Sequence, residues 1–348
     1  MNYDTEYQPF ELEETEFDGE GDFGSSEFDQ GFEFESTPKV RLKNSLNIVR
    51  IGDRSGFEQP RVKPRTHREI SEEIAPPTDD RQPVADTTGF PFRFICHVRV
   101  GFTTGRGGPY GTMEGTGFLI GTKYVLTAGH NIIRDIEYKG RHYTAFAHKI
   151  TVTPGLNTSR PQENWRPFGE YPANRWIAHS KWNTPGWNEE FDYGLITLKN
   201  DAMESDDPLG YWGSRAYGRG TQITVFKPDQ LKDKVVNVCG YPSDKCGDQP
   251  LTGNCPKGKA AGTQFMASDK IMDPSPAAQP RLLYHQVDTA EGQSGGPLWG
   301  KEKDSGKQYL IGVHTGGFHD AKGAFVRNRA VRITNEVLAQ LRTWGWRA

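Results

Sequence analysis

The sequence has no long apolar run, and none of its stretches approaches the roughly 18 residues that a membrane-spanning helix needs. Its N-terminus also lacks the basic and apolar regions of an ordinary secretory signal peptide. These absences predict a chain with no membrane partner. We expect it to be secreted or exported by a non-standard route.

Cysteine is scarce, with four residues and no CxxC pair, which argues against a zinc ribbon. Cys239, Cys246 and Cys255 lie close together in the sequence, while Cys96 is far upstream. This spacing leaves open one or two disulfides and their pairing. No metal-ligand constellation and no basic cluster with interleaved aromatics is present, so we predict no cofactor and no nucleic-acid partner, with a structural calcium left open.

Basic residues are absent from residues 1–36, which hold thirteen of the 45 acidic residues. The remainder of the chain therefore carries a net charge of +10, and the acidic arm could contact this basic body. Such charge density predicts a disordered tail, although its regularly placed phenylalanines leave open a docking role. Residues 37–84, rich in Pro, Arg, Glu and Asp, have the composition of a linker or propeptide.

The region 85–348 has the pattern of a turn-rich β protein, and the chain contains 40 Gly and 23 Pro. In "FPFRFICHVRV" alternate residues from Phe90 to Val100 are apolar, which predicts a strand with one buried face. Similar short segments follow: "TGFLIG", "KYVLTA", "QITVF", "KVVNVCG", "RLLYHQV", "YLIGVH" and "AVRIT". Only "TNEVLAQLRTWGW" has helical periodicity, with Thr334 or Asn335 as its N-cap. We predict antiparallel sheets in a sandwich or barrel, followed by a C-terminal helix.

Three segments of this β region could supply a base, an acid and a nucleophile. His130 follows the predicted strand in "KYVLTAGHN", and Asp192 begins the apolar segment "DYGLITL". Ser294 lies in the glycine-rich "GQSGGP", where the backbone N–H groups of Gly292 and Ser294 could bind an oxyanion. Each segment alone is weak evidence for catalysis. Together the three predict a serine nucleophile that is activated by a histidine, with an aspartate that orients the histidine.

These segments resemble the three catalytic blocks of chymotrypsin-fold serine endopeptidases, in particular the bacterial branch of V8-like glutamyl endopeptidases. The resemblance rests on "GTGFLIGTKYVLTAGH", "FDYGLITL" and "DTAEGQSGGP", and it extends over "VNVCGYPSDK", "GTQFMAS" and "IGVHTGG". It covers about residues 85–348 and implies two six-stranded antiparallel β-barrels. It also implies that His130 is the general base, Asp192 the orienting acid and Ser294 the nucleophile, with Gly292 as the second oxyanion donor.

Within the resemblance, Thr289 and His314 match positions that contact an acidic P1 side chain, the residue before the cleaved bond. A hydroxyl and an imidazole can both hydrogen-bond a carboxylate, and the neighbouring Thr315 and Gly316 have the character of a pocket wall. Glu291 departs from the family pattern, because a carboxylate at the pocket rim would repel an acidic P1 residue unless it turned into solvent or paired with Lys or Arg.

The resulting expectation is a monomeric serine endopeptidase that acts on polypeptides, prefers Glu or Asp at P1 and is made as a precursor. Glu72 and Glu73 precede the predicted protease domain, so the enzyme could process itself there. One alternative is an endopeptidase of non-acidic specificity, on account of Glu291. The other is a noncatalytic binding module, which the presence of all three catalytic residues disfavours.

Overall fold

The structure is a computed structural model of the 348-residue chain. It describes residues 79–104, 110–138, 141–184, 186–199, 209–214, 220–246, 249–250, 262–319 and 325–347. The acidic arm 1–36, the linker up to residue 78 and Cys255 lie outside the described residues, so the expectations about them stay predictions.

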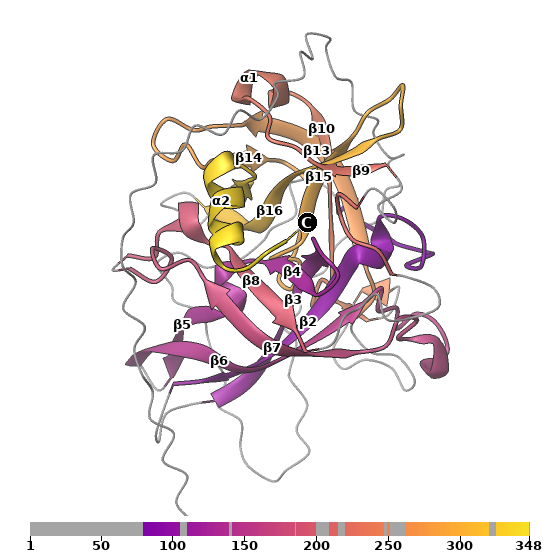
Figure 1. The fold of residues 1–348 in the computed structure, drawn as a ribbon, viewed down its shortest axis with the longest axis vertical. Helices are drawn as coiled ribbons and strands as arrows, with labels where there is room; N and C mark the ends of the chain where they lie inside the picture. The colour runs from indigo at the N-terminus through magenta and orange to yellow at the C-terminus, as the bar shows by residue number, and fades with distance from the viewer. Residues whose placement is uncertain are drawn as a thin grey trace, which may run out of the picture. The chain divides into compact units, whose positions relative to one another are not determined.

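The first half of the described chain forms a closed antiparallel barrel, drawn in indigo to rose in Figure 1. Six strands follow one another around it in the order β2, β3, β4, β8, β7 and β6, and β2 pairs with β6 to close the ring. A seventh strand, β5, lies at the edge of this sheet and pairs with β6. The strand bounds are β2 Ile95–Thr103, β3 Tyr110–Leu119, β4 Tyr124–Thr127, β5 Ile133–Tyr138, β6 Arg141–Pro154, β7 Tyr171–Ala178 and β8 Gly194–Leu198.

The second half forms another closed barrel, in orange and yellow, with strand order β13, β10, β15, β16, β17 and β14 and closure between β13 and β14. The short strands β1 and β9 pair with its members β13 and β16, and β11 and β12 form a separate ribbon. The bounds are β1 Gln82–Pro83, β9 Thr221–Ile223, β10 Val235–Gly240, β11 Lys245–Cys246, β12 Gln249–Pro250, β13 Phe265–Asp273, β14 Leu282–His285, β15 Pro297–Lys301, β16 Gln308–His319 and β17 Phe325–Arg332. The predicted pair of six-stranded barrels is confirmed.

Two α-helices are present among the described residues, α1 (Pro228–Leu231) and the predicted C-terminal helix α2 (Asn335–Thr343). Thr334 is the N-cap of α2, and its hydroxyl accepts the N–H of Val337 at 3.3 Å. After the helix, the indole of Trp346 donates to the carbonyl of Ile120 in the first barrel at 2.7 Å. Neither helix is long and apolar enough to cross a membrane.

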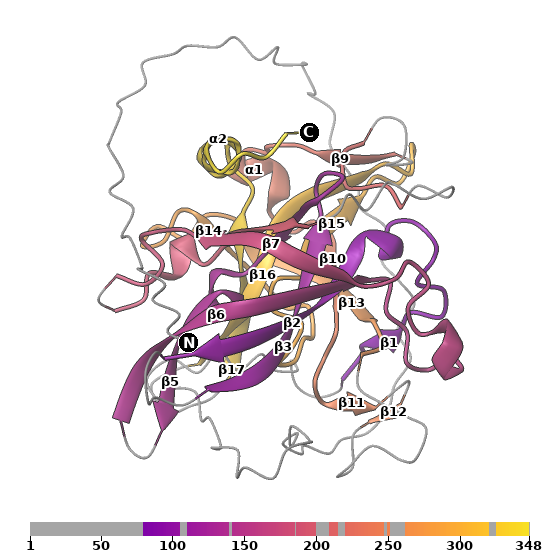
Figure 2. The same ribbon diagram turned by 60° about the horizontal axis from the view of Figure 1, so that its bottom comes forward.

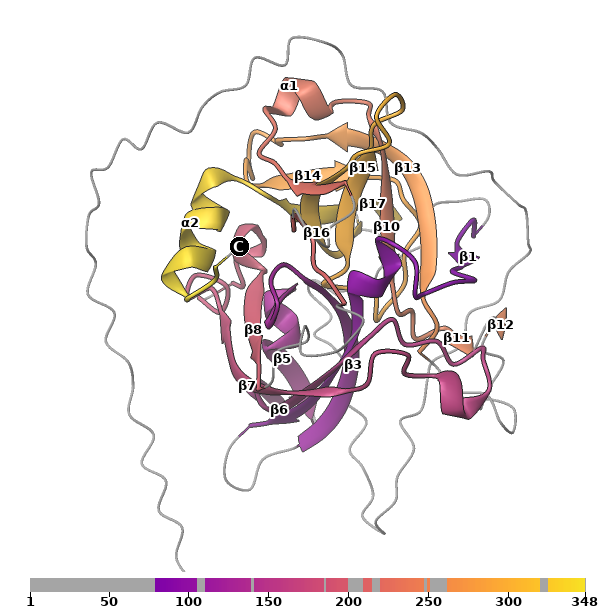
Figure 3. The same ribbon diagram turned by 45° about the vertical axis from the view of Figure 1, so that its right-hand side comes forward.

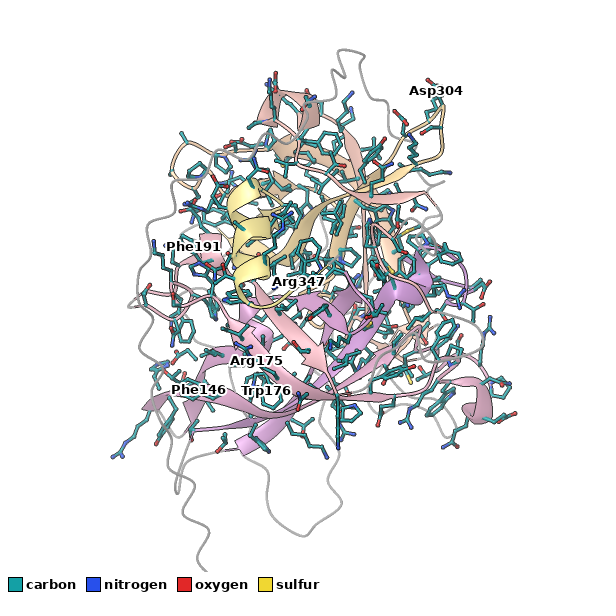
Figure 4. The ribbon with its side chains drawn as sticks, in the orientation of Figure 1. Phe146, Arg175, Trp176, Phe191, Asp304 and Arg347 are labelled. Atoms are coloured by element: carbon teal, nitrogen blue, oxygen red, sulfur yellow. The ribbon has the colours of Figure 1, made fainter. Side chains whose placement is uncertain are left out.

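The sequence pattern misplaced the start of the first long strand. Phe92–Phe94 form a 3₁₀ turn, and β2 begins only at Ile95, because the fixed φ and missing N–H of Pro91 favour a turn over a sheet ladder. The segments that became β6 and β7 were not recognised either. Figure 4 labels Arg175 and Trp176 on β7. All but one of the side chains of β7 are exposed or half-buried, so apolar and polar residues do not alternate regularly along it.

The cysteines occupy different environments. Cys96 and Cys239 are free thiols buried in the core, and burial raises the pKa of both well above its usual value. Cys246 on β11 is disulfide-bonded. The two buried thiols therefore behave as small apolar core residues.

Candidate active site

His130 and Asp192 are brought together by one pair of neighbouring strands. His130 lies in a 3₁₀ turn, Gly129–Asn131, soon after β4 ends, and Asp192 lies two residues before β8 begins. Because β4 and β8 run antiparallel with Thr127 opposite Gly194, the end of one strand meets the start of the other. Local turns at two distant points of the sequence thus place the imidazole beside the carboxylate.

Both oxygens of the Asp192 carboxylate are occupied by His130. The ring Nδ1 lies 2.7 Å from Oδ2, and the backbone N–H donates to Oδ1 at 2.8 Å. Asp192 is 0% exposed and His130 only 2%, so water does not compete for these bonds. A carboxylate in this position holds a proton on Nδ1, which leaves Nε2 as an acceptor, and it stabilises an imidazolium.

The loop before Ser294 makes a tight turn from Ala290 to Gln293, closed by a hydrogen bond of 3.0 Å between the N–H of Gln293 and the carbonyl of Ala290. Gly292 adopts φ +96° in this turn, and an added Cβ would lie 2.4 Å from the carbonyl oxygen of Tyr241. Both the dihedral angle and the close approach therefore demand glycine.

Two peptide carbonyls of this loop are bonded to neighbouring backbone. The N–H of Ser243 donates to the carbonyl of Glu291 at 2.7 Å, and the N–H of Gly296 donates to that of Gln293 at 2.9 Å. In a planar trans peptide the N–H points opposite to the carbonyl. The N–H groups of Gly292 and Ser294 are therefore directed away from these partners, as an oxyanion hole requires.

Two residues that the sequence gave no reason to select, Thr116 and Asn131, join the first barrel to this loop. Thr116 on β3 donates its hydroxyl to the carbonyl of Gly292 at 2.7 Å, and its backbone N–H donates to the carbonyl of Ser294 at 2.9 Å. The amide of Asn131, directly after His130, donates to the same Ser294 carbonyl at 3.0 Å. The sequence carries no signal for these two residues, because their burial and their contacts with the loop cannot be read from it.

The residues predicted to contact P1 are all buried in the second barrel. Thr289, His314 and Thr315 are each 0% exposed, and Gly316 adopts φ +137° beside them. The hydroxyl oxygens of Thr289 and Thr315 have no hydrogen-bond partner among the described residues. Buried hydroxyls usually have partners, so these two oxygens are suited to receive a ligand's polar group.

A second histidine lies behind His314: His285 Nε2 is 3.3 Å from His314 Nδ1. Burial lowers the pKa of His314 to about 3, and the positive charge of Arg329 contributes in the same direction. Burial also holds the pKa of His285 well below its usual value, with His314 adding to the effect. Both imidazoles are therefore neutral near pH 7 in the unliganded protein.

Glu291 lies on the exposed side of the turn, within electrostatic range of a cation from the other barrel. Burial lowers the pKa of Arg134 on β5, while the charges of Glu291 and Asp192 act against that shift. Arg134 Nη1 lies 2.8 Å from the sulfur of Met113. Solvent and Arg134 together weaken the repulsion that Glu291 could exert on an acidic substrate.

No group of three or more His, Cys, Asp or Glu side chains able to hold a metal ion is found in the described part of the chain.

The segment directly before Asp192 is held in place by aromatic contacts. The Phe191 ring, labelled in Figure 4, lies 4.5 Å from that of His179. The cations of Lys181 and Arg281 lie 5.4 and 5.0 Å from the Phe191 ring.

Residues 96–335 match the protein family described as trypsin, a span that includes all three candidate catalytic residues. The chain belongs to the trypsin family. It is thereby a serine endopeptidase by descent, and polypeptides are the substrates of its family.

Two curated Bacillus proteins resemble this trypsin-family chain over most of its length. A glutamyl endopeptidase of Bacillus licheniformis is 30% identical over 77% of this chain and 67% of its own. A Bacillus subtilis protein named extracellular metalloprotease is 27% identical over 77% of this chain and 68% of its own. Among solved structures, a Glu endopeptidase in complex with MPD has a TM-score of 0.51, with 20% identity, covering 76% of this chain and 95% of that one. That last similarity supports the fold.

Proposed function

We propose that this chain is an active serine endopeptidase in which Ser294 is the nucleophile, His130 the general base and Asp192 the orienting acid. The observation that carries the proposal is the buried 2.7 Å contact between His130 and Asp192. Asn131, the residue after His130, binds the carbonyl of Ser294 at 3.0 Å and so keeps the nucleophile loop beside the histidine.

In this mechanism Ser294 Oγ attacks the substrate carbonyl carbon while its proton moves to His130 Nε2. The imidazolium that forms is stabilised by the buried Asp192 carboxylate, and the oxyanion accepts hydrogen bonds from the N–H groups of Gly292 and Ser294. The imidazolium then protonates the leaving amine, which yields an acyl-enzyme. Water, deprotonated by the same imidazole, hydrolyses the ester and restores Ser294.

We further propose that P1 is Glu or Asp. The hydroxyls of Thr289 and Thr315 and the imidazole of His314 offer hydrogen-bond donors in a region where water is excluded. Arg329 carries the nearby positive charge: it donates to the carbonyl of Gly317 and lies 3.6 Å from Glu189. A bound carboxylate would also favour the protonated form of His314 and so raise its pKa from about 3.

The preference can be measured with two peptides that differ only by Glu or Gln at P1. We expect kcat/KM to favour Glu by about 10- to 100-fold, because hydrogen bonds to a charged group are stronger than those to a neutral isostere. Thr289→Val, which keeps the side-chain shape, should lower kcat/KM for the Glu peptide by about fivefold or more and hardly change it for the Gln peptide. His314→Leu should remove most of the preference.

His142→Leu is the matched control, because His142 is an exposed histidine that pairs with Asp135 on β5. It should leave the Glu-to-Gln ratio unchanged. Equal cleavage of both peptides by an active wild-type enzyme, or a preference for Arg or large apolar P1 residues, would favour the alternative of non-acidic specificity. The absence of any cleavage would favour the noncatalytic binding module. Precursor processing and the monomeric state stay predictions.

A further inference from the structure

A buried arginine outside the catalytic triad is bonded to the residue beside the nucleophile. The side chain of Arg81 is 0% exposed, and its Nη1 donates to Oε1 of Gln293 at 3.3 Å. Its guanidinium also contacts both oxygens of Asp79 at 2.9 Å and those of Asp244 at 3.0 and 2.5 Å. Lys245 completes the cluster at 2.7 Å from Asp79, so two cations face two carboxylates.

Arg81 belongs to a short N-terminal segment, Asp79–Val84, that lies along the second barrel. The N–H of Asp80 donates to the Asp288 carboxylate at 2.9 Å, and the N–H of Val84 donates to the carbonyl of Gln264 at 2.8 Å. Between them β1 pairs with β13, and β1 lies beside that strand in Figures 2 and 3. The segment precedes residue 85, where the sequence pattern placed the start of the protease domain.

The buried side chain of Gln293 bridges the turn from Ala290 to Gln293, which we call the oxyanion turn. Its Oε1 accepts the N–H of Ala290 at 3.0 Å in addition to Arg81, and its Nε2 donates to the carbonyl of Phe265 at 3.2 Å. Asp244, another partner of Arg81, directly follows Ser243, whose N–H donates to the carbonyl of Glu291. The ion cluster therefore holds the turn at two points.

Stability alone is a weak reason for such a cluster. Burying charges costs desolvation free energy, and apolar side chains of similar volume often stabilise a protein as well or better. A buried charge network does, however, favour one arrangement of the groups that it joins, because any other arrangement leaves a buried charge unpaired.

We propose that Arg81 is a positioning residue for the oxyanion turn, acting through Gln293, and that the active enzyme must retain Asp79–Arg81 wherever its precursor is cut. This inference rests on the proposed function. Without Arg81, Oε1 of Gln293 and the carboxylate of Asp244 both lose a cationic hydrogen-bond donor. The turn from Ala290 to Gln293 then loses its fixed geometry. The N–H donors then no longer converge on the transition state.

Arg81→Met tests this in the full-length protein and in its matured form. We expect kcat to fall about 10- to 100-fold with KM changed less than about threefold, because the lost interaction acts in the transition state. Inhibition by a peptide aldehyde, whose hemiacetal oxyanion needs the same donors, should weaken by a similar factor, while the product peptide should bind nearly as before. If Arg81 had a purely structural role, its loss would lower the melting temperature without lowering kcat more than KM and without weakening aldehyde binding more than product binding.

Arg160→Met is the matched control, because Arg160 holds the chain directly after Asp79–Val84, through the carbonyl of Ala85 at 3.2 Å and Asp86 at 3.5 Å, and neither contact involves Gln293. It should retain wild-type kcat. Gln293→Met, which leaves the ion cluster in place, should reproduce the loss, and Arg81→Lys should restore part of it. These two variants keep the test decisive if Arg81→Met folds poorly.

Two results would overturn the inference: a folded Arg81→Met or Gln293→Met enzyme with wild-type kcat and aldehyde affinity, or an active mature enzyme whose N-terminal sequence begins after Arg81. An inactive wild-type protein would count against the proposed function instead. The two failures are therefore distinguishable.

Discussion

Asp192→Asn is expected to lower kcat about 10⁴-fold while KM changes little. The reason lies in how the carboxylate is held. Its Oδ1 accepts the backbone N–H of His130 at 2.8 Å, so an asparagine there must keep its oxygen on that side. The amide NH₂ then faces Nδ1 in place of Oδ2, which forces Nδ1 to accept and moves the imidazole proton to Nε2. In that tautomer His130 cannot take the proton of Ser294.

The chain provides a second aspartate–histidine pair as a control. Asp135 on β5 lies 3.0 Å from Nδ1 of His142, but His142 is exposed. Asp135→Asn should leave kcat within about twofold of wild type, because surface ion pairs contribute little. Steady-state kinetics on one peptide substrate compares the two variants. Similar kcat values for both would show that Asp192 does not orient a catalytic histidine.

Gly292→Ala is expected to lower kcat by about 10²- to 10³-fold, the usual cost of losing one oxyanion donor. An added Cβ would lie 2.4 Å from the carbonyl of Tyr241, which is backbone and cannot rotate away. The turn would have to shift, and the peptide between Glu291 and Gly292 would rotate its N–H out of place. Substrate binding in the P1 pocket should be less affected, so the change should appear in kcat more than in KM.

Gly169→Ala separates backbone strain from this collision. Gly169 also has a left-handed conformation, at φ +78°, but an added Cβ there meets no atom within 4 Å. It should lower stability modestly and leave kcat unchanged. If Gly292→Ala kept wild-type kcat, the oxyanion would have to be bound elsewhere.

The parts of the site that the sequence predicted are those encoded locally. His130, Asp192 and Ser294 each lie in a short motif next to an apolar strand, and the family that these motifs resemble implied the two barrels. Thr116 could not be found in this way, because threonine is a common strand residue and its role depends on a contact with Gly292 across two barrels.

Arg81 shows the same limit more strongly. Its surroundings, rich in Pro, Arg, Glu and Asp, have the composition of a linker. The role that we propose for it depends on a contact with Gln293, which is 212 positions away in the sequence. For Glu291 the sequence indicated that its charge could repel an acidic P1 residue, but not which cation lies near it. The cation whose pKa Glu291 acts to raise, Arg134, comes from the opposite barrel.

The central claim, that Ser294 is a nucleophile activated by His130 and Asp192, is most directly tested by covalent trapping. The wild-type enzyme can be treated with a peptidyl phosphonate bearing a glutamate side chain at P1, and the modified residue can be mapped by mass spectrometry. We expect one adduct per molecule, on Ser294, and labelling at least about 10²-fold slower in Asp192→Asn. An adduct on any other residue, or equal labelling rates in the two proteins, would contradict the proposed mechanism.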